Sequence, residues 1–430
     1  MFRDEFPALN RLSLKSVNFN SFFSSASSTL MTLIDLFHGN SFEMDNLAFL
    51  SSEGLNSRCK NLYEVLMNKG YRVNALWYTT KKEELEKGIN IWSKNLEKVY
   101  ATNVLCKLEK KIDESTDEQP FALHLCDLVS HISHSDDFTD DSKNYTEKYR
   151  KACIHSDNLI DYTLNLLEKK GLLDNTVILL YGDHGDEYWT HGFNAGYIHI
   201  LEPYTSQIWT PMMIYSSDLK PEKINKPAST VDIRKTCLGL LGIQDPDSFE
   251  YAGIDLFKDE NKVVFSQNFL ANQQYHPTLP LRKAYCVVNE TYNLVVSDSG
   301  LEMYAYKLDT TNHCNLLNFF ELDSKGLLRF KKPRKTSGHF DDIFIKTDKN
   351  ILDIQKNFYE LRNLLKERVT IKNNMVEAKK KTLLTLKNFD KLNHSDRARF
   401  LCPKVRLNPY KWAKLTEQKF RKLRKKVFKH

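Results

Sequence analysis

The middle of the chain alternates apolar runs with one long amphipathic segment. Residues 121–128 (FALHLCDL) and 176–181 (TVILLY) are short apolar stretches, as expected of strands buried inside a parallel sheet. Between them, residues 143–170 place apolar side chains at helical spacing and end at Gly171, a residue typical of helix C-termini. Residues 211–215 (PMMIY) predict a further strand. This order predicts an α/β fold with a doubly wound, mostly parallel sheet flanked by helices.

The pattern changes after residue 260. Residues 262–320 contain four short apolar runs separated by turn residues, which predict a small antiparallel sheet. From residue 323 on, the chain is rich in lysine and its apolar positions favour helices. We therefore expect an α/β domain over residues 1–260, a small antiparallel C-terminal sheet packed on it over 261–322, and a basic, mostly helical tail over 323–430.

Composition narrows the class of protein. Of 430 residues, 41% are apolar and 27% charged, which is typical of a globular chain with a sizeable core. The apolar runs are far shorter than the roughly 20 residues that a membrane-spanning helix needs, and the N-terminal segment lacks the apolar core of a signal peptide. These features predict a protein that is cytoplasmic or bound peripherally to a membrane. Eight cysteines without a Cys-x-x-Cys pair predict reduced thiols.

Charge is distributed unevenly along the chain. From Lys325 to His430 there are 31 Lys and Arg against 10 Asp and Glu, whereas the rest of the chain carries a net charge of −14. Such a basic tail can bind an anionic lipid, a polyanionic glycan, nucleic acid or the acidic body of the same protein. Specific nucleic-acid recognition is not expected, because only the tail would support it.

The first candidate site follows the predicted strand 176–181. Asp183 and His184 stand between two glycines, and His191 follows eight residues after Asp183. Carboxylate and imidazole together suit a borderline cation such as Zn²⁺ or Mn²⁺. Ligands of α/β sheets bind at the C-terminal ends of the strands, so this position predicts a functional site. The alternative is a polar turn with an N-cap aspartate.

A second cluster follows the predicted strand 121–128. It contains Asp127, His131 and His134. Asp127 and His131 could supply a second metal, but we expect only one of these side chains to face the site. The alternative is an ordinary loop rich in polar residues.

The third segment, residues 24–39, is a run of small hydroxyl residues followed by an apolar helical stretch that ends in glycine. Hydroxyls at a helix N-terminus lie near unpaired N–H groups and the positive end of the helix dipole. Beside a divalent metal, such a hydroxyl is a candidate nucleophile toward sulfate or phosphate esters. Ordinary N-capping by Ser27 or Ser28 explains the segment equally well.

Together these residues resemble the sulfatase-like branch of the alkaline phosphatase superfamily. Thr29, with Leu36 and Gly39, matches the spacing between the nucleophile of that branch and the Leu-x-x-Gly that closes its helix. Sulfatases place Cys or Ser there, followed by Pro-x-Arg, and convert it to formylglycine. Here the residue is Thr, and the Pro and Arg are missing. The chain is therefore more similar to lipoteichoic acid synthases and phosphoethanolamine transferases, which use threonine as the phosphoryl acceptor.

Further motifs occur in the order of the family. Residues 182–186 and 191–192 resemble its Asp-His-Gly-Glu…His-Gly segment, and His131 resembles the His after the preceding strand. The resemblance implies that Asp183, His184 and Thr29 bind the metal, and that Thr29, His131 and His191 are catalytic or bind the substrate. It extends over residues 5–320, with further matches at 207–215, 231–242 and 306–316.

The sequence departs from the family pattern at its N-terminus. Family members begin with an apolar strand that ends in an Asp or Glu metal ligand, whereas residues 5–18 already resemble the segment after that strand. Asp4 and Glu5 follow no apolar run. We therefore expect one metal ligand and one central strand to be missing, because the chain is a fragment, because its start is misplaced, or because another chain supplies the strand.

The resemblance implies a metal-dependent hydrolase or transferase that acts on a phosphate or sulfate ester through Thr29. We rank phosphate slightly ahead, with an anionic ester on a cell-envelope glycan or lipid head group as the substrate. The expected cofactor is a divalent ion, either Zn²⁺, Mn²⁺, Ca²⁺ or Mg²⁺. The alternative is a catalytically inactive family member that binds polyanions, or a membrane surface, through its basic tail.

Overall fold

The structure is a computed structural model of the chain. It describes residues 4–39, 60–78, 97–101, 104–114, 119–131, 145–188, 197–198, 202–246, 253–268, 283–331, 348–375 and 386–393. None of the helices in these ranges is both long enough and apolar enough to cross a lipid bilayer.

Within the described residues, the α/β part of the chain contains two larger sheets. The first is parallel throughout, in the order β4 (Glu97–Ala101), β3 (Arg72–Tyr78), β5 (Phe121–Asp127). The second is mixed, in the order β10 (Glu222–Ile224), β1 (Val17–Phe19), β9 (Met212–Tyr215), β6 (Ile178–Tyr181). The predicted α/β class is confirmed. β9, however, runs antiparallel to both of its neighbours, a direction that its apolar pattern could not reveal.

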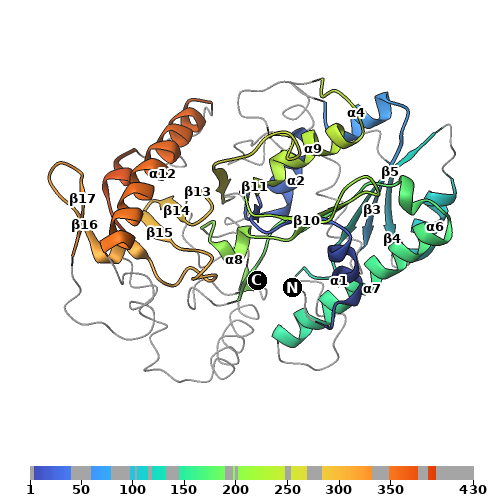
Figure 1. The fold of residues 1–430 in the computed structure, drawn as a ribbon, viewed down its shortest axis with the longest axis horizontal. Helices are drawn as coiled ribbons and strands as arrows, with labels where there is room; N and C mark the ends of the chain where they lie inside the picture. The colour runs from blue at the N-terminus through green and yellow to red at the C-terminus, as the bar shows by residue number, and fades with distance from the viewer. Residues whose placement is uncertain are drawn as a thin grey trace, which may run out of the picture.

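Helices cover both faces of this layer, as Figure 1 shows. One face is covered by α7 (Tyr145–Lys169), with α6 (Val104–Asp113) and α1 (Pro7–Leu14) beside it. The other is covered by α2 (Thr29–His38), α4 (Leu62–Asn68) and α9 (Ile233–Leu240). The buried Asp157 of α7 accepts hydrogen bonds from the backbone N–H groups of Ala8 and Leu9, at 3.1 and 2.7 Å, and so fixes the start of α1.

The antiparallel sheet follows the α/β part. It is a meander of β12 (Val264–Gln267), β13 (Ala284–Val288), β14 (Asn293–Ser297) and β15 (Gly300–Tyr304). One of its faces packs on the α/β part, where Cys286 and Val295 join a cluster with Phe23 and Tyr204. The opposite face packs under α12 (Asp348–Met375), which lies at the far end of the molecule from α7 in Figure 1.

α12 shares its core with the antiparallel sheet, although the sequence pattern placed it in a separate tail. Phe358, Leu361 and Leu365 are fully buried in one cluster with Val287 and Val296 of the sheet. At least this part of the predicted tail is therefore packed structure. The boundaries of the three predicted parts stay a prediction, and residues 394–430 lie outside the described residues.

Shorter elements complete the described part of the fold. The remaining strands are β2 (Phe22–Phe23), parallel to β11 (Ala228–Ser229), and the antiparallel pairs β7 (Glu187–Tyr188) with β8 (Tyr197–Ile198) and β16 (Phe320–Leu322) with β17 (Leu328–Phe330). The short helices are α8 (Thr205–Ile208), η3 (Leu173–Asn175), η4 (Thr230–Asp232), η5 (Leu316–Phe319) and η6 (Leu386–Asp390).

Replacing Leu361 with alanine should lower the free energy of unfolding by about 3 kcal/mol, because it leaves a cavity between α12 and the sheet. Leu352 lies on the same helix with 66% of its surface exposed, so Leu352→Ala should change stability by less than about 0.5 kcal/mol. Urea unfolding measures both. Equal, small effects for the two variants would show that α12 does not pack on the sheet in solution.

Candidate active site

Thr29 is the first residue of α2, at the end of a buried loop of hydroxyl residues. Ser28 is the N-cap, with extended backbone (φ −157°, ψ 132°), and makes no side-chain capping bond to the helix. Below it, the Ser24 hydroxyl pairs with that of Thr32 at 2.7 Å. The Ser25 N–H donates to the Thr230 hydroxyl at 3.0 Å, which ties the loop to the 3-10 helix η4. These buried contacts hold the loop in one conformation and fix the position of Thr29.

His184 contacts Thr29 directly. Its Nε2 lies 2.8 Å from Thr29 Oγ1, and its Nδ1 lies 2.8 Å from the backbone oxygen of Gly185. A carbonyl oxygen only accepts hydrogen bonds, so Nδ1 carries the proton and Nε2 is the acceptor in the neutral ring. The Thr29 hydroxyl therefore donates to His184 Nε2. The histidine side chain is 5% exposed, which keeps this bond largely away from water.

The loop after β6 places the carboxylate of Asp183 beside His184. Asp183 Oδ2 lies 3.5 Å from His184 Nε2, and its side chain is 32% exposed. Gly185 is required here, because a Cβ at this position would lie 2.1 Å from the backbone oxygen of Ser206. The Gly185 N–H also donates to the Gln207 oxygen at 2.8 Å. The structure thus brings together three predicted site residues, Thr29, Asp183 and His184, at the carboxyl end of β6.

These three side chains fit a divalent cation in the chemistry of their donor atoms. A carboxylate, an imidazole and a hydroxyl converge, and such mixed oxygen and nitrogen sets bind Zn²⁺ and Mn²⁺. Among the described residues, however, no group of three or more His, Cys, Asp or Glu side chains is placed to hold a metal. The three described donors are therefore of the right chemical type for a divalent cation. They are fewer than the four protein ligands of a closed site.

In the second predicted cluster, Asp127 ends β5 and its carboxylate accepts two hydrogen bonds. Asp127 Oδ2 accepts from the Ser156 hydroxyl at 2.5 Å, and Oδ1 accepts from the Val129 N–H at 2.9 Å. Burial raises the pKa of the Asp127 carboxyl above its ordinary value, while these two hydrogen bonds lower it. The bond from Val129 orders the turn that carries His131, and the bond from Ser156 ties the end of β5 to α7. The role of His131 as a substrate ligand stays a prediction, and His134 and His191 lie outside the described residues.

A family model for sulfatases matches residues 2–243 of this chain. The chain belongs to the sulfatase family. Among curated relatives, the lipoteichoic acid synthase of Staphylococcus aureus (strain USA300) is 32% identical over 175 residues, which cover 35% of this chain and 25% of that protein. The match therefore spans about a quarter of the length of the relative.

Solved structures of sulfatase-like proteins share the fold. A 2-O GAG sulfatase matches with a TM-score of 0.60 at 14% identity, covering 91% of this chain and 90% of that one. The lipoteichoic acid synthase LtaP from Listeria monocytogenes matches with a TM-score of 0.51 at 17% identity, covering 67% and 76%. The predicted resemblance to the sulfatase-like branch of the alkaline phosphatase superfamily is confirmed, and with it the alkaline phosphatase-like fold.

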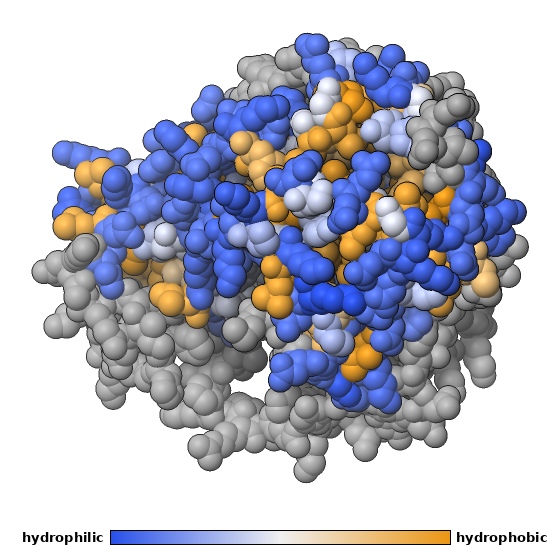
Figure 2. Space-filling view, turned by 45° about the vertical axis from the view of Figure 1, so that its right-hand side comes forward, coloured by the Kyte–Doolittle hydropathy of each residue, from blue (hydrophilic) through white to orange (hydrophobic). Residues whose placement is uncertain are grey.

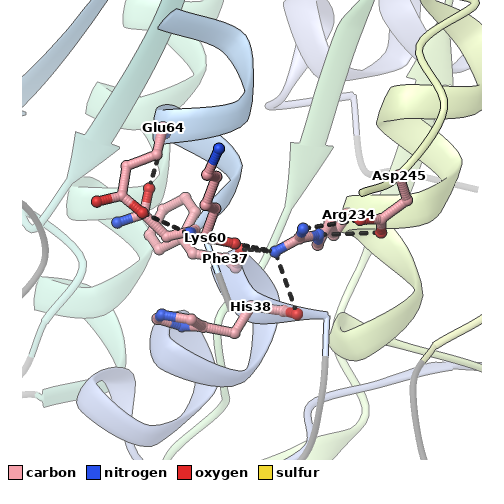
Figure 3. Close-up of polar contacts among 7 residues, drawn as sticks. Phe37, His38, Lys60, Glu64, Arg234 and Asp245 are labelled. Carbon is pink, nitrogen blue, oxygen red and sulfur yellow. Dashed lines mark hydrogen bonds and ion pairs between the residues drawn. The ribbon is translucent and has the colours of Figure 1, made fainter. Parts of the chain in front are cut away.

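In this sulfatase-family chain the far end of the Thr29 helix is held by an arginine that the motifs did not single out. Arg234 of α9 is 1% exposed, and Nε and Nη2 donate to the two carboxylate oxygens of Asp245 at 3.0 and 2.7 Å. Nη1 donates to the backbone oxygens of Phe37 and His38, each at 3.4 Å, and to that of Lys60 (Figure 3). The guanidinium thus caps the C-terminal carbonyls of α2 and joins them to the segment that precedes α4.

The helix end is shaped for this arginine. Gly39 ends α2 with φ +64°, and a Cβ there would lie 2.8 Å from Arg234 Cδ. The glycine at the end of α2 therefore has a local physical cause in this chain. No sequence pattern pointed to Arg234, because its contacts to α2 span almost 200 positions.

A partly buried histidine lies beside the predicted metal ligands. His124 of β5 has its Nδ1 2.6 Å from the Tyr63 hydroxyl and its Nε2 3.1 Å from the Tyr181 hydroxyl. Burial lowers the pKa of His124 from its ordinary value to about 4, although the charge of Asp183 opposes the shift. A neutral ring satisfies one tyrosine as donor and the other as acceptor. A protonated ring would donate to both.

This lowered pKa predicts acid sensitivity. In the unfolded chain His124 takes up a proton near pH 6.5, but in the folded chain only near pH 4, so stability falls as the pH drops through this window. The expected loss is about 3 kcal/mol between pH 7 and pH 4. His124→Gln should lose correspondingly less stability over the same range. Urea unfolding at several pH values tests this, and identical pH profiles for the two proteins would contradict it.

Proposed function

We propose that this chain transfers or hydrolyses a phosphate or sulfate ester through a covalent ester on Thr29, with phosphate ranked ahead of sulfate. The observation that carries the proposal is the 2.8 Å contact between Thr29 Oγ1 and His184 Nε2 at the carboxyl end of β6. The membership of the sulfatase family supports ester chemistry, and the threonine at the nucleophile position supports phosphoryl transfer.

In this mechanism Thr29 Oγ1 attacks the phosphorus or sulfur atom, and the bond from that atom to the leaving-group oxygen breaks. In the described geometry the hydroxyl donates to His184 Nε2, and because that nitrogen is also the one that would hold the cation, the hydroxyl proton would pass to solvent. The N-terminal end of α2 places its positive dipole beside the charge that develops on the nonbridging oxygens. Water or an acceptor hydroxyl then attacks the same atom and releases Thr29.

Asp183, His184 and the Thr29 hydroxyl would hold the divalent cation, either Zn²⁺, Mn²⁺, Ca²⁺ or Mg²⁺. When bound, it would supply positive charge that lowers the pKa of the nucleophile and neutralises the ester. We propose, from the resemblance, that His131 and His191 bind the nonbridging oxygens or protonate the leaving group. Protonation of the leaving oxygen completes the proton balance of the first step.

The similar proteins favour a glycan or lipid head group as the carrier of the ester. Lipoteichoic acid synthases are among the curated relatives, and a structural neighbour is a 2-O GAG sulfatase. We propose that this chain acts on an anionic ester of the same general kind, in the cell envelope or at its surface. Hydrolysis and transfer differ only in the acceptor, which is water in the first case and an acceptor hydroxyl in the second.

The experiment combines cation binding with turnover on the full chain. Calorimetric titration with Mn²⁺, Zn²⁺, Mg²⁺ and Ca²⁺ should show one binding event that Asp183→Ala abolishes and that Asp218→Ala, at an exposed position, leaves intact. With the preferred cation, p-nitrophenyl phosphate esters should turn over faster than p-nitrophenyl sulfate. Full turnover in Asp183→Ala would refute the assignment. No binding and no turnover in the wild type would instead support the inactive alternative.

A further inference from the structure

The short helix α8 lies between the two loops that form the candidate active site. Its Ile208 oxygen accepts a hydrogen bond from the Ser24 N–H at 2.7 Å, in the loop that precedes Thr29. Its Gln207 oxygen accepts from the Gly185 N–H at 2.8 Å, in the loop that follows β6. One helix of four residues is thus bonded both to the loop of the proposed nucleophile and to the loop of the proposed cation ligands.

The contact between α8 and the loop after β6 is especially close. A Cβ at Gly185 would lie 2.1 Å from the Ser206 oxygen, so the backbone of the loop lies directly against the helix. The Gly185 oxygen in turn accepts from His184 Nδ1 at 2.8 Å. A shift of α8 would therefore move Gly185 and, with it, the imidazole ring whose Nε2 contacts Thr29. The position of α8 sets the geometry between His184 and Thr29.

α8 depends on contacts outside itself for its position. Isolated helices shorter than about 12 residues are only marginally stable in water, and α8 has four residues. Contacts to the C-terminal part of the chain supply the support. The Thr205 N–H donates to Asn312 Oδ1 at 2.5 Å, and the hydroxyl of the N-cap residue Tyr204 donates to Glu302 Oε2 at 3.0 Å. In Figure 1, α8 accordingly lies between the C-terminal sheet and the α/β layer.

Glu302 is a buried carboxylate in the middle of β15. On the face drawn in Figure 2, hydrophilic residues cover most of the described surface, whereas Glu302 is 1% exposed. Burying a carboxylate lowers stability unless hydrogen-bond donors compensate it. Here Oε2 accepts from Tyr204, and Oε1 accepts from Asn393 Nδ2 at 3.1 Å. Val295, which lies opposite Glu302 on β14, packs in the cluster that joins the sheet to the α/β part.

Asn393 orients the carboxylate from the other side. Its backbone N–H donates to the Leu301 oxygen at 2.8 Å, and the Leu301 N–H donates to the Lys391 oxygen at 3.0 Å. This segment, which the sequence pattern placed in the tail, is therefore paired with β15 beside Glu302. It fixes the Asn393 side chain, and so helps to hold the carboxylate where Tyr204 reaches it.

We propose that Glu302 is a positioning residue for the candidate active site. It holds Tyr204 and thereby α8, and α8 sets the distance between His184 and Thr29. The inference rests on the proposed function, which assigns His184 to the cation and Thr29 to the attack on the ester. It adds that the C-terminal sheet supports this site. A displacement of about 1 Å in a catalytic site can lower turnover about 100-fold, so the position of α8 should affect the rate strongly.

Hydrogen exchange at single-residue resolution tests the positional part on the full chain, without cation or substrate. Tyr204→Phe removes one hydroxyl and keeps the ring, so the amides of Ser24 and Gly185, which are bonded to α8, should exchange at least about tenfold faster. Tyr306→Phe is the matched control, because its hydroxyl donates to a backbone oxygen at 3.1 Å in the same apolar cluster. Unchanged exchange at Gly185 in Tyr204→Phe, or an equal increase in the control, would overturn the proposal.

Cation binding and kinetics test the consequence for the site. In Tyr204→Phe the Kd of the preferred cation should rise about tenfold, and kcat at saturating cation should fall about tenfold while KM changes less than about twofold. Glu302→Gln keeps an acceptor oxygen for the Tyr204 hydroxyl and should retain the wild-type Kd within about twofold, whereas Glu302→Leu should behave like Tyr204→Phe. Lower stability with unchanged Kd and kcat would show a purely structural role and overturn the proposal.

Failure of this inference and failure of the proposed function give different results. Wild-type cation binding and turnover, combined with unchanged exchange in Tyr204→Phe, would refute the role of Glu302 alone. A wild type that binds no cation and turns over no ester would refute the proposed function and, with it, the role of Glu302 in the site.

Discussion

Replacing Thr29 with alanine should lower the turnover of the preferred ester by at least about 1,000-fold. The change removes the only atom of the residue that can form the covalent intermediate, and a loss of that size corresponds to about 4 kcal/mol of transition-state stabilisation. The fold should be unaffected, because the loop before α2 is held by Ser24, Ser25 and Thr230, none of which is changed. Steady-state kinetics at saturating substrate measure the effect.

Thr29→Ser is the matched control for this prediction. It keeps a hydroxyl at the same position and should retain a measurable part of the activity, because serine can also donate to His184 Nε2. Thr29→Ala with undiminished turnover would contradict the proposed nucleophile. So would a serine variant as inactive as the alanine variant if its stability were equal to that of the wild type.

Replacing Arg234 with methionine should lower the free energy of unfolding by about 4 kcal/mol. The change leaves the Asp245 carboxylate without its bidentate partner and removes the donor to the carbonyls of Phe37 and His38. Removing one partner of a buried ion pair typically costs 3–5 kcal/mol, because the remaining charge is left uncompensated. Urea unfolding measures the loss.

Two further variants separate the buried charge from general damage. Arg234→Met combined with Asp245→Leu should lose less stability than the sum of the two single changes, because no lone charge remains. Arg329 pairs with Asp323 at the surface with 65% of its side chain exposed, so Arg329→Met should cost less than about 1 kcal/mol. Equal losses at Arg234 and Arg329 would contradict the structural role assigned to Arg234.

The core of the site could be predicted because its signals are local. The apolar run before Asp183 and His184 forms β6, and the run after Thr29 forms α2, as their periodicity indicates. The resemblance then predicted that Thr29, Asp183 and His184 share one metal site, and the structure places Thr29 and His184 in contact. Short motifs at strand ends are informative because the sheet itself brings the ends together.

The features that could not be predicted depend on contacts between distant segments. The antiparallel direction of β9, the packing of α12 under the C-terminal sheet and the contacts of Arg234 all join elements far apart in the sequence. Their local patterns are compatible with other arrangements, because an apolar strand or an amphipathic helix does not specify its partner. The apolar positions after residue 323 favoured helices, but the lysine-rich composition led us to place them in a tail instead of against the C-terminal sheet.

The most direct test of the proposed chemistry is mass spectrometry of the full chain after rapid acid quench during turnover. We predict that the peptide containing Thr29 gains the mass of one phosphoryl or sulfuryl group, and that fragmentation places this group on Thr29. The gain should be absent in Thr29→Ala and without substrate. Sustained turnover with no modified Thr29 peptide at any quench time would contradict a covalent threonine ester and redirect the mechanism to direct attack by water.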